Sequence, residues 1–195
     1  MPHSINFQNT YAKELSEICK KSIPAGFIES EVLLKNYNLA EELELNKNFI
    51  DSKECLAIFS GVCLPKSSIP IAQAYSGHQF GHFSPELGDG RAILLGEIND
   101  HDIQLKGIGQ TPFSKRGDGK SSLGPVLREY VVSEFMHSIK IPSTRALLAI
   151  KTNENVLRDT EQPGGVLARV AKSHIRIGTF EYARNKNNEI LKSLA

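Results

Sequence analysis

Hydrophobic residues of this chain form two short runs, Ala92 to Ile98 and Ile103 to Ile108, that are separated by a polar break. Two apolar runs of this length joined by a short polar segment predict a β-hairpin. Because side chains alternate between the two faces of a strand, Lys106 is expected on the face opposite Leu105, together with Ile108. The pattern therefore predicts a lysine held at a fixed position on a strand.

A different pattern predicts a helix from Pro125 to Ile139. Proline is tolerated in the first turn of a helix, where its missing N–H group is not needed. In this helix Glu129 shares a stripe with Val132 and Met136. A carboxylate that borders an apolar face is stabilised by a cation, and Lys106 is the candidate partner. The alternative is that Lys106 is a solvated lysine and that Glu129 is an unrelated charge at the edge of the helix.

The remaining pattern predicts an α+β fold, with a mostly antiparallel sheet packed against the helix that carries Glu129. A strand is expected from Gly165 to Ala171, and Ser173 is expected to cap a short helix that runs through Ile177. Turn residues near Pro70 divide the chain into residues 1–70, expected to be mostly helical, and residues 71–195, although a loop within one domain fits equally well. In the first region helices are expected at Thr10–Lys21, Leu39–Leu43 and Ser52–Ser60, with short extended pieces between Pro24 and Asn38.

Glycine and cationic residues are concentrated around the predicted hairpin. One glycine turn, Gly88 to Arg91, precedes the hairpin, and another, Gly117 to Gly119, lies in the loop that follows it. Free backbone N–H groups and cations in such loops bind phosphate well. Arg169 and Arg176 sit on adjoining elements, and planar guanidinium groups grip phosphate oxygens in bidentate fashion. A nucleotide is therefore the leading ligand.

Composition excludes several classes of protein. The chain has 195 residues, 40% of them hydrophobic, which is enough to form a buried core without disulfide bonds or bound metal ions. A net charge of +1 offers no broad basic face for nucleic acid. No apolar run approaches the roughly 20 residues of a membrane span, and no signal segment is present, so the cytoplasm is the expected location. The three cysteines are Cys19, Cys55 and Cys63. They lack a CxxC spacing and therefore indicate neither a disulfide framework nor a zinc ribbon.

Three other functions fit parts of the sequence. The stretch from Ser114 to Ser121 nearly matches a P-loop, but serine stands in place of the leading glycine, and Gly124 with Pro125 interrupts the helix that must follow. His78 and His82 have the spacing of histidines in a zinc hydrolase, but the glutamate that acts as base is missing between them. A non-catalytic module that binds a nucleotide or another polyanion stays open.

Long motifs across the chain are similar to those of one known family. They are the runs Tyr75–Phe83, Leu87–Ala92, Leu105–Ser114, Gly117–Gly119, Leu127–Tyr130, Ile141–Ala146 and Leu167–Arg176, with a looser match at Asn9–Ala12. On these motifs the chain resembles the selenoprotein O family, also called YdiU, whose members are kinase-like protein adenylyltransferases. The resemblance covers nearly the whole chain.

This resemblance implies the fold of a protein-kinase amino-terminal lobe in residues 71–195, and ATP bound in an orientation flipped relative to ordinary kinases. AMP would pass to a Ser, Thr or Tyr hydroxyl of a protein substrate, with pyrophosphate leaving. Lys106 would bind phosphate and Glu129 would be its ion-pair partner. An acid beside phosphates is repelled unless it pairs with a cation, so Asp118 is expected to orient one. The other nucleotide contacts implied by the resemblance are Gly88, Gly90, Arg91, Gly119, Arg169 and Arg176.

The sequence departs from the family pattern in two ways. Residues 120–125 stand where many members carry an arginine-rich helix start. The family also places the proton acceptor and the Mg²⁺ ligands beyond the position of Arg176, and no aspartate follows Asp159 here. The proton acceptor and the magnesium ligands are therefore expected beyond Ala195. We expect an amino-terminal portion of a longer enzyme, which binds ATP but is inactive by itself.

Overall fold

The protein is described by a computed structural model that covers residues 5–194. Its strands are β1 (Cys19–Lys21), β2 (Ser30–Lys35), β3 (Ile71–Gln73), β4 (Gly77–Gln79), β5 (His82–Ser84), β6 (Ala92–Ile98), β7 (His101–Lys106), β8 (Ser121–Ser122), β9 (Arg145–Leu157) and β10 (Glu161–Ala171). Its helices are α1 (Thr10–Glu14), α2 (Tyr37–Glu42), α3 (Lys47–Ile50), α4 (Lys53–Phe59), α5 (Leu123–Ser138), α6 (Ile177–Arg184) and α7 (Asn188–Leu194), with a 3-10 turn at Ser16–Ile18.

Residues 1–4 and Ala195 lie outside the described residues. The expectation that the proton acceptor follows Ala195 concerns chain beyond this point and stays a prediction.

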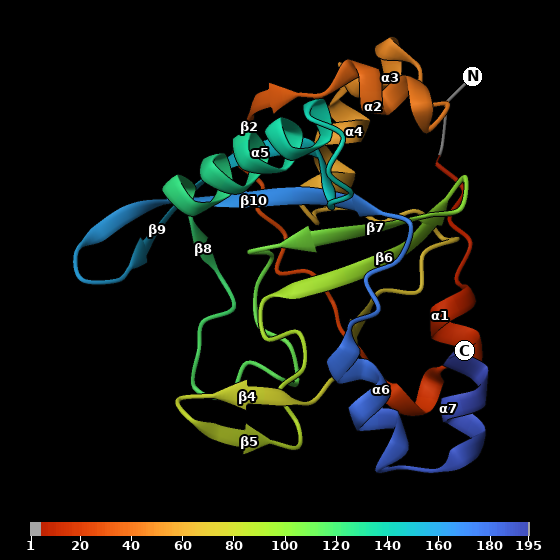
Figure 1. The fold of residues 1–195 in the computed structure, drawn as a ribbon. Helices are drawn as coiled ribbons and strands as arrows, with labels where there is room; N and C mark the ends of the chain where they lie inside the picture. Colours follow the sequence, from red (N-terminus) through yellow and green to blue (C-terminus); the bar gives the residue numbers. More distant parts are fainter. Residues whose placement is uncertain (1–4, 195) are drawn as a thin grey trace.

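Within residues 5–194, one antiparallel sheet runs in the order β1-β3-β6-β7-β10-β9-β2, with β8 paired to β10 (Figure 1). Strands β4 and β5 form a separate hairpin. The predicted hairpin is present as β6 and β7, and the predicted helix as α5. The α+β architecture with a mostly antiparallel sheet is therefore confirmed.

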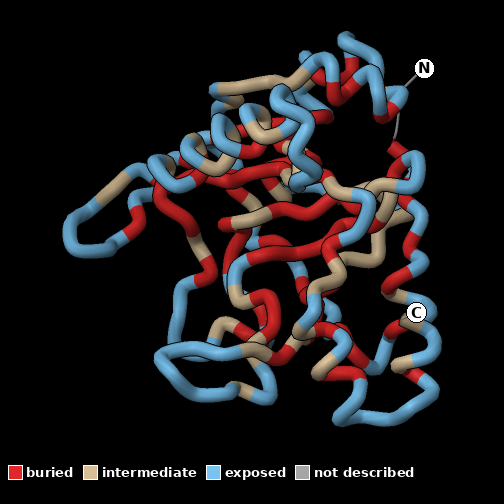
Figure 2. The backbone as a smooth tube through the Cα atoms, viewed as in Figure 1, coloured by how far each residue is buried: buried red, intermediate tan, exposed pale blue. Residues whose placement is uncertain are grey.

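Helices cover the two faces of the sheet unequally. Helices α2 to α4 pack on one face, where Phe59 shares a core with Ile93 and Leu105. On the opposite face α5 covers β9 and β10 (Figure 1). On the same face α1, α6 and α7 share a core with β3 and β6. Figure 2 shows that the central strands are buried in spite of this divided cover. On this second face a strip of β7 and β10 lies between α5 on one side and α1, α6 and α7 on the other. Polar side chains occupy this strip.

The expected alternation along β7 holds up to Lys106 and then reverses. Leu105 lies in the core beneath α4, and Lys106 leaves on the other face. Ile108 was expected beside Lys106 but belongs to the same core as Leu105. Gly107 has φ +88°, a backbone conformation that breaks the pleat and returns the next side chain to the core side.

Residues 1–70 contain more strand than the sequence predicted. The helix expected from Thr10 to Lys21 ends at Glu14, and the last three residues of that span form β1 instead. Strand β1 pairs with β3, and β2 pairs with β9, and this pairing overrides the local helical pattern. Residues 1–70 therefore supply the strands at both edges of the sheet. The expected helices near Leu39–Leu43 and Ser52–Ser60 are present as α2 and α4, while α3 was missed.

Two expectations about side chains and caps are wrong. The helix expected to start after Ser173 begins at Ile177, because the Ser173 hydroxyl is taken up by a local turn to the N–H of Ile175. On α5 the predicted apolar stripe faces outward at Val132, which is 51% exposed. The face that packs on the sheet carries Val126 instead, and Glu129 lies at its border.

One glycine holds the amino-terminal segment against the sheet. Gly96 has φ +132° at a register shift in β6, and a Cβ there would lie 2.4 Å from the carbonyl oxygen of Gln8. Gly96→Ala is expected to lower the free energy of unfolding by about 3 kcal/mol, because it adds both backbone strain and a backbone clash. Gly81→Ala is the control, since φ is +79° there but nothing lies within 4 Å. Gly81→Ala should lower the free energy of unfolding by only about 1 kcal/mol. Urea unfolding measures both, and equal losses would contradict the role of the clash.

Candidate functional site

Three polar side chains occupy the strip between the two groups of helices. Gln104 and Lys106 project from β7, and Arg169 projects from β10 directly opposite Gln104. Buried positions are normally apolar, and charged side chains are almost never fully buried unless they are paired. A fully buried glutamine and two cations at this point therefore indicate a site built for polar chemistry.

Lys106 and Arg169 share a single carboxylate. Lys106 Nζ lies 2.5 Å from one oxygen of Glu129, and Arg169 Nη1 lies 3.2 Å from the other. The ion pair predicted between Lys106 and Glu129 is thus present in the structure. Two cations and one anion leave one positive charge in excess. Burial lowers the pKa of the Arg169 guanidinium, while the charge of Glu129 opposes that effect.

A hydrogen-bonded chain links this cluster to α6. Arg169 donates to the side-chain oxygen of Gln104, whose amide nitrogen donates to Asp89 at 3.0 Å. The other oxygen of Asp89 accepts from Arg176 Nη1 at 2.9 Å. The guanidinium of Arg176 lies 4.4 Å from the ring centre of Tyr75, a cation–π distance. The two arginines predicted from sequence are therefore joined through Gln104 and Asp89, two residues for which the sequence predicted no role.

The first glycine turn is locked to the loop that follows the hairpin. The hydroxyl of Thr111 donates to the carbonyl of Asp89, and that of Ser114 donates to the carbonyl of Gly90, each at 2.6 Å. Gly88 has φ +68°, and a Cβ there would lie 2.2 Å from the ring of Phe113. Only glycine fits this turn, which fixes the backbone beneath the pocket.

Asp118 orients a cation, as predicted, but the cation is one that the sequence did not reveal. Its carboxylate binds Arg158 at 2.9 and 3.1 Å and also accepts the backbone N–H of Lys120. The hydrogen bond from Arg158 lowers the pKa of the Asp118 carboxyl. Arg158 lies 40 residues further along, in the turn between β9 and β10, so no local motif indicated the pair.

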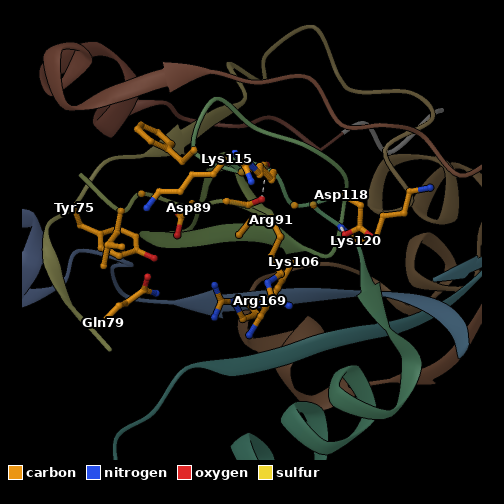
Figure 3. A pocket seen from close by; sticks show the side chains of 18 of the residues that line it. Tyr75, Gln79, Asp89, Arg91, Lys106, Lys115, Asp118, Lys120 and Arg169 are labelled. Atoms are coloured by element: carbon orange, nitrogen blue, oxygen red, sulfur yellow. Dashed lines mark hydrogen bonds between the residues drawn. The ribbon is translucent and has the colours of Figure 1, made fainter. Parts of the chain in front are cut away.

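These elements surround a cavity of about 770 Å³ (Figure 3). In Figure 3, Lys106 and Arg169 lie between Tyr75 with Gln79 at one end and Asp118 with Lys120 at the other. Among the described residues, three cations of the lining have no carboxylate partner: Arg91, Lys115 and Arg116. All eight contacts proposed from sequence line this cavity: Gly88, Gly90, Arg91, Lys106, Asp118, Gly119, Arg169 and Arg176.

Comparison with known proteins shows the family of this chain. The sequence model of the family described as "Protein adenylyltransferase SelO" matches residues 2–195. The chain belongs to the SelO family. Proteins named "Protein nucleotidyltransferase YdiU" from Nitrobacter hamburgensis, Anoxybacillus flavithermus and Agrobacterium fabrum are 50%, 48% and 49% identical to it. The matches cover 98%, 97% and 98% of this chain but only 39%, 41% and 40% of those relatives. This SelO-family chain thus spans about two fifths of their length.

The lining suits a polyphosphate better than a magnesium ion. Among the residues that line the cavity, only Asp89 and Asp118 carry carboxylates, and each is paired with an arginine. Magnesium prefers free carboxylate oxygens together with phosphate oxygens. In residues 5–194 no cluster of three or more His, Cys, Asp or Glu side chains is arranged to hold a metal ion. The lining residues of this family member therefore do not make a magnesium site, whereas their excess positive charge fits ATP.

The structure speaks against both competing motifs. His78 and His82 lie on the two strands of the β4–β5 hairpin instead of on a helix, and Gln79 is the register partner of His82. Register partners share a face and chain neighbours alternate, so His78 and His82 point to opposite faces of the hairpin. The P-loop alternative fails because β8 intervenes between the loop and α5, and Lys120 is paired with Glu154.

No helix of the described chain is both long enough and apolar enough to cross a bilayer.

A buried histidine beside the site makes the stability of the protein depend on pH. The His174 side chain is 2% exposed, and burial lowers its pKa from the ordinary value near 6.5, although Asp102 opposes the shift. As the pH falls through 6.5 the unfolded chain binds a proton more readily than the folded chain, so the free energy of unfolding decreases as the pH decreases. The loss between pH 7 and 5 is expected to be at most about 1.4 kcal/mol per pH unit from this group.

Urea unfolding of His174→Gln at several pH values measures this contribution. The variant should lose part of the pH dependence seen in the natural sequence. His82→Gln, at an exposed position of the β4–β5 hairpin, is the control and should leave the dependence unchanged. Identical pH profiles for the natural sequence and His174→Gln would contradict the assignment.

Proposed function

We propose that this chain is the ATP-binding part of a protein adenylyltransferase. The observation that carries the proposal is the pair of cations, Lys106 and Arg169, that share Glu129 at the centre of the cavity. A strand lysine paired with a glutamate on the following helix is how protein kinases position nucleotide phosphates. The order of β7 and α5 supports a likeness to the kinase amino-terminal lobe.

In the proposed reaction a Ser, Thr or Tyr hydroxyl of a protein attacks the α-phosphorus of ATP. The bond from the α-phosphorus to the bridging oxygen breaks, and pyrophosphate leaves with both electrons of that bond. Lys106, Arg169 and Arg91 would neutralise the phosphate oxygens, and Arg176, held by Asp89, would neutralise the departing pyrophosphate. One well-placed arginine is worth roughly 10³ to 10⁵ in rate in related phosphoryl transfers.

The proton acceptor and the magnesium ligands are proposed to lie beyond Ala195. The two carboxylates of the cavity are already paired with Arg158 and Arg176, which leaves neither free to take the hydroxyl proton. By itself the chain is expected to bind ATP without measurable AMP transfer, and in that respect it would behave as a nucleotide-binding module. The location in the cytoplasm stays a prediction.

Calorimetric titration with ATP tests the proposal. Lys106→Met is expected to weaken binding at least tenfold, or about 1.4 kcal/mol, because it removes one of the two cations at the centre of the cavity and leaves Glu129 neutralised by Arg169 alone. Lys35→Met is the matched control, since Lys35 also forms an ion pair, with Asp51, but does not line the cavity. It should leave the affinity unchanged. A folded chain that binds no ATP, or equal losses in both variants, would contradict the proposal.

A further inference from the structure

Helix α5 carries Glu129, yet little apolar packing holds this helix on the sheet. Of its apolar side chains only Val126, near the amino-terminal end, is buried. In residues 131–138 the apolar side chains are exposed or half-buried, and Phe135 is 58% exposed. Burial of apolar surface is the usual source of helix docking energy. The second half of α5 therefore depends on another kind of contact to fix its position.

That contact is the carboxylate of Glu134. Arg145 Nε donates to both of its oxygens, at 3.0 and 3.1 Å, and Arg145 Nη2 donates to one of them at 2.9 Å. The backbone N–H of Ala146 donates to it at 2.9 Å, and the side-chain amide of Asn36 donates at 2.7 Å. One carboxylate on α5 thus binds the first two residues of β9 and the residue that precedes α2.

The pair of Glu134 and Arg145 is shielded from water and well oriented. Their side chains are 22% and 11% exposed. Burial raises the pKa of Glu134, but the hydrogen bonds from Arg145 and from the backbone N–H of Ala146 outweigh burial and hold this pKa below its ordinary value. An arginine that binds a carboxylate through two nitrogens restricts orientation as well as distance. The pair therefore limits both the position and the rotation of α5 relative to β9.

The position of α5 determines where Glu129 lies. Glu129 and Glu134 are five residues apart on one continuous helix, a rise of about 7.5 Å along its axis. Because the helix is unbroken between them, a shift at Glu134 displaces Glu129. The Glu129 carboxylate must reach Lys106 on β7 and Arg169 on β10 at the same time. The placement of the helix on the sheet therefore sets the geometry of both cations.

We propose that Glu134 and Arg145 are positioning residues for the ATP site. By fixing α5 on β9, they hold Glu129 where it orients the two cations of the cavity. Neither Glu134 nor Arg145 lines the cavity, so their influence on the ligand passes through Glu129. This inference rests on the proposed function and deepens it, because it names residues outside the cavity that set the affinity for ATP.

Calorimetric titration of two matched variants with ATP tests this role. Glu134→Gln removes the charge that binds Arg145, and it is expected to weaken ATP binding roughly three- to tenfold, within the range for residues that act on a site through others. Glu42→Gln is the control, because Glu42 binds the same arginine but from α2 instead of α5, at 3.2 and 3.4 Å. It should change the affinity by less than about twofold.

A double-mutant cycle separates positioning from a general loss of structure. In a Glu129→Gln background, Glu134→Gln should have no further effect on the affinity for ATP, because the carboxylate through which it acts is gone. A merely structural role would weaken ATP binding by the same factor in both backgrounds. Arg145→Lys is a second variant of the same contact. Its affinity should lie between those of the natural sequence and Glu134→Gln, since lysine keeps the charge but loses the bidentate geometry.

Two results would overturn this inference and leave the proposed function intact. Folded Glu134→Gln could bind ATP as tightly as the natural sequence, or it could lose the same factor with and without the Glu129 carboxylate. If Glu134→Gln does not fold, Arg145→Lys takes its place in the same cycle, with the same two results against the inference. Failure of the folded natural sequence to bind ATP would overturn the proposed function and this inference with it.

Discussion

The structure around the cavity depends on one electrostatic constraint, the sharing of Glu129 by Lys106 and Arg169. Two partly buried cations facing one carboxylate repel each other, and their repulsion is relieved only by an anion. The protein holds them in place by anchoring both to central strands of the sheet, where neither can move away. Such an arrangement favours an anionic ligand over water.

The unequal cover of the sheet creates the space that this cluster needs. Helix α5 packs over β9 and β10, and helices α1, α6 and α7 pack over β3 and β6, so the polar side chains of β7 lie between these helices. The glycine turn at Gly88 and the loop at Ser114 then close this gap from the side, through hydroxyl groups bound to backbone carbonyls. Rigid backbone at the rim and fixed cations on the floor give a preorganised pocket, which lowers the entropy lost on binding.

Local sequence patterns account for the predicted elements that the structure confirms. Pairing between distant segments accounts for the elements and residues that the sequence did not predict. Alternation in β7 and the proline at the start of α5 predicted the two elements, and the family resemblance supported the pairing of Lys106 with Glu129. Strand β9 was not predicted, because the apolar run Ala146–Ile150 in its buried half fits a helix segment as well as a strand covered on both faces. Arg158 was missed because only the β9–β10 turn brings it to Asp118. The switch of Ile108 to the core depends on the φ angle of Gly107, which side-chain periodicity does not report.

Both edges of the sheet come from the first 35 residues, and this affects how the chain acquires its structure. During synthesis β2 emerges early, yet Ser30 must wait for Thr152 before it has a partner. Closing so long a loop is slow, and an unpaired strand can meanwhile join another chain. Strand β1 waits a shorter time, because β3 follows it at Ile71. Docking of β2 closes the longest loop among the strand pairs of residues 5–194, and it covers the edge of β9, which would otherwise be open to aggregation.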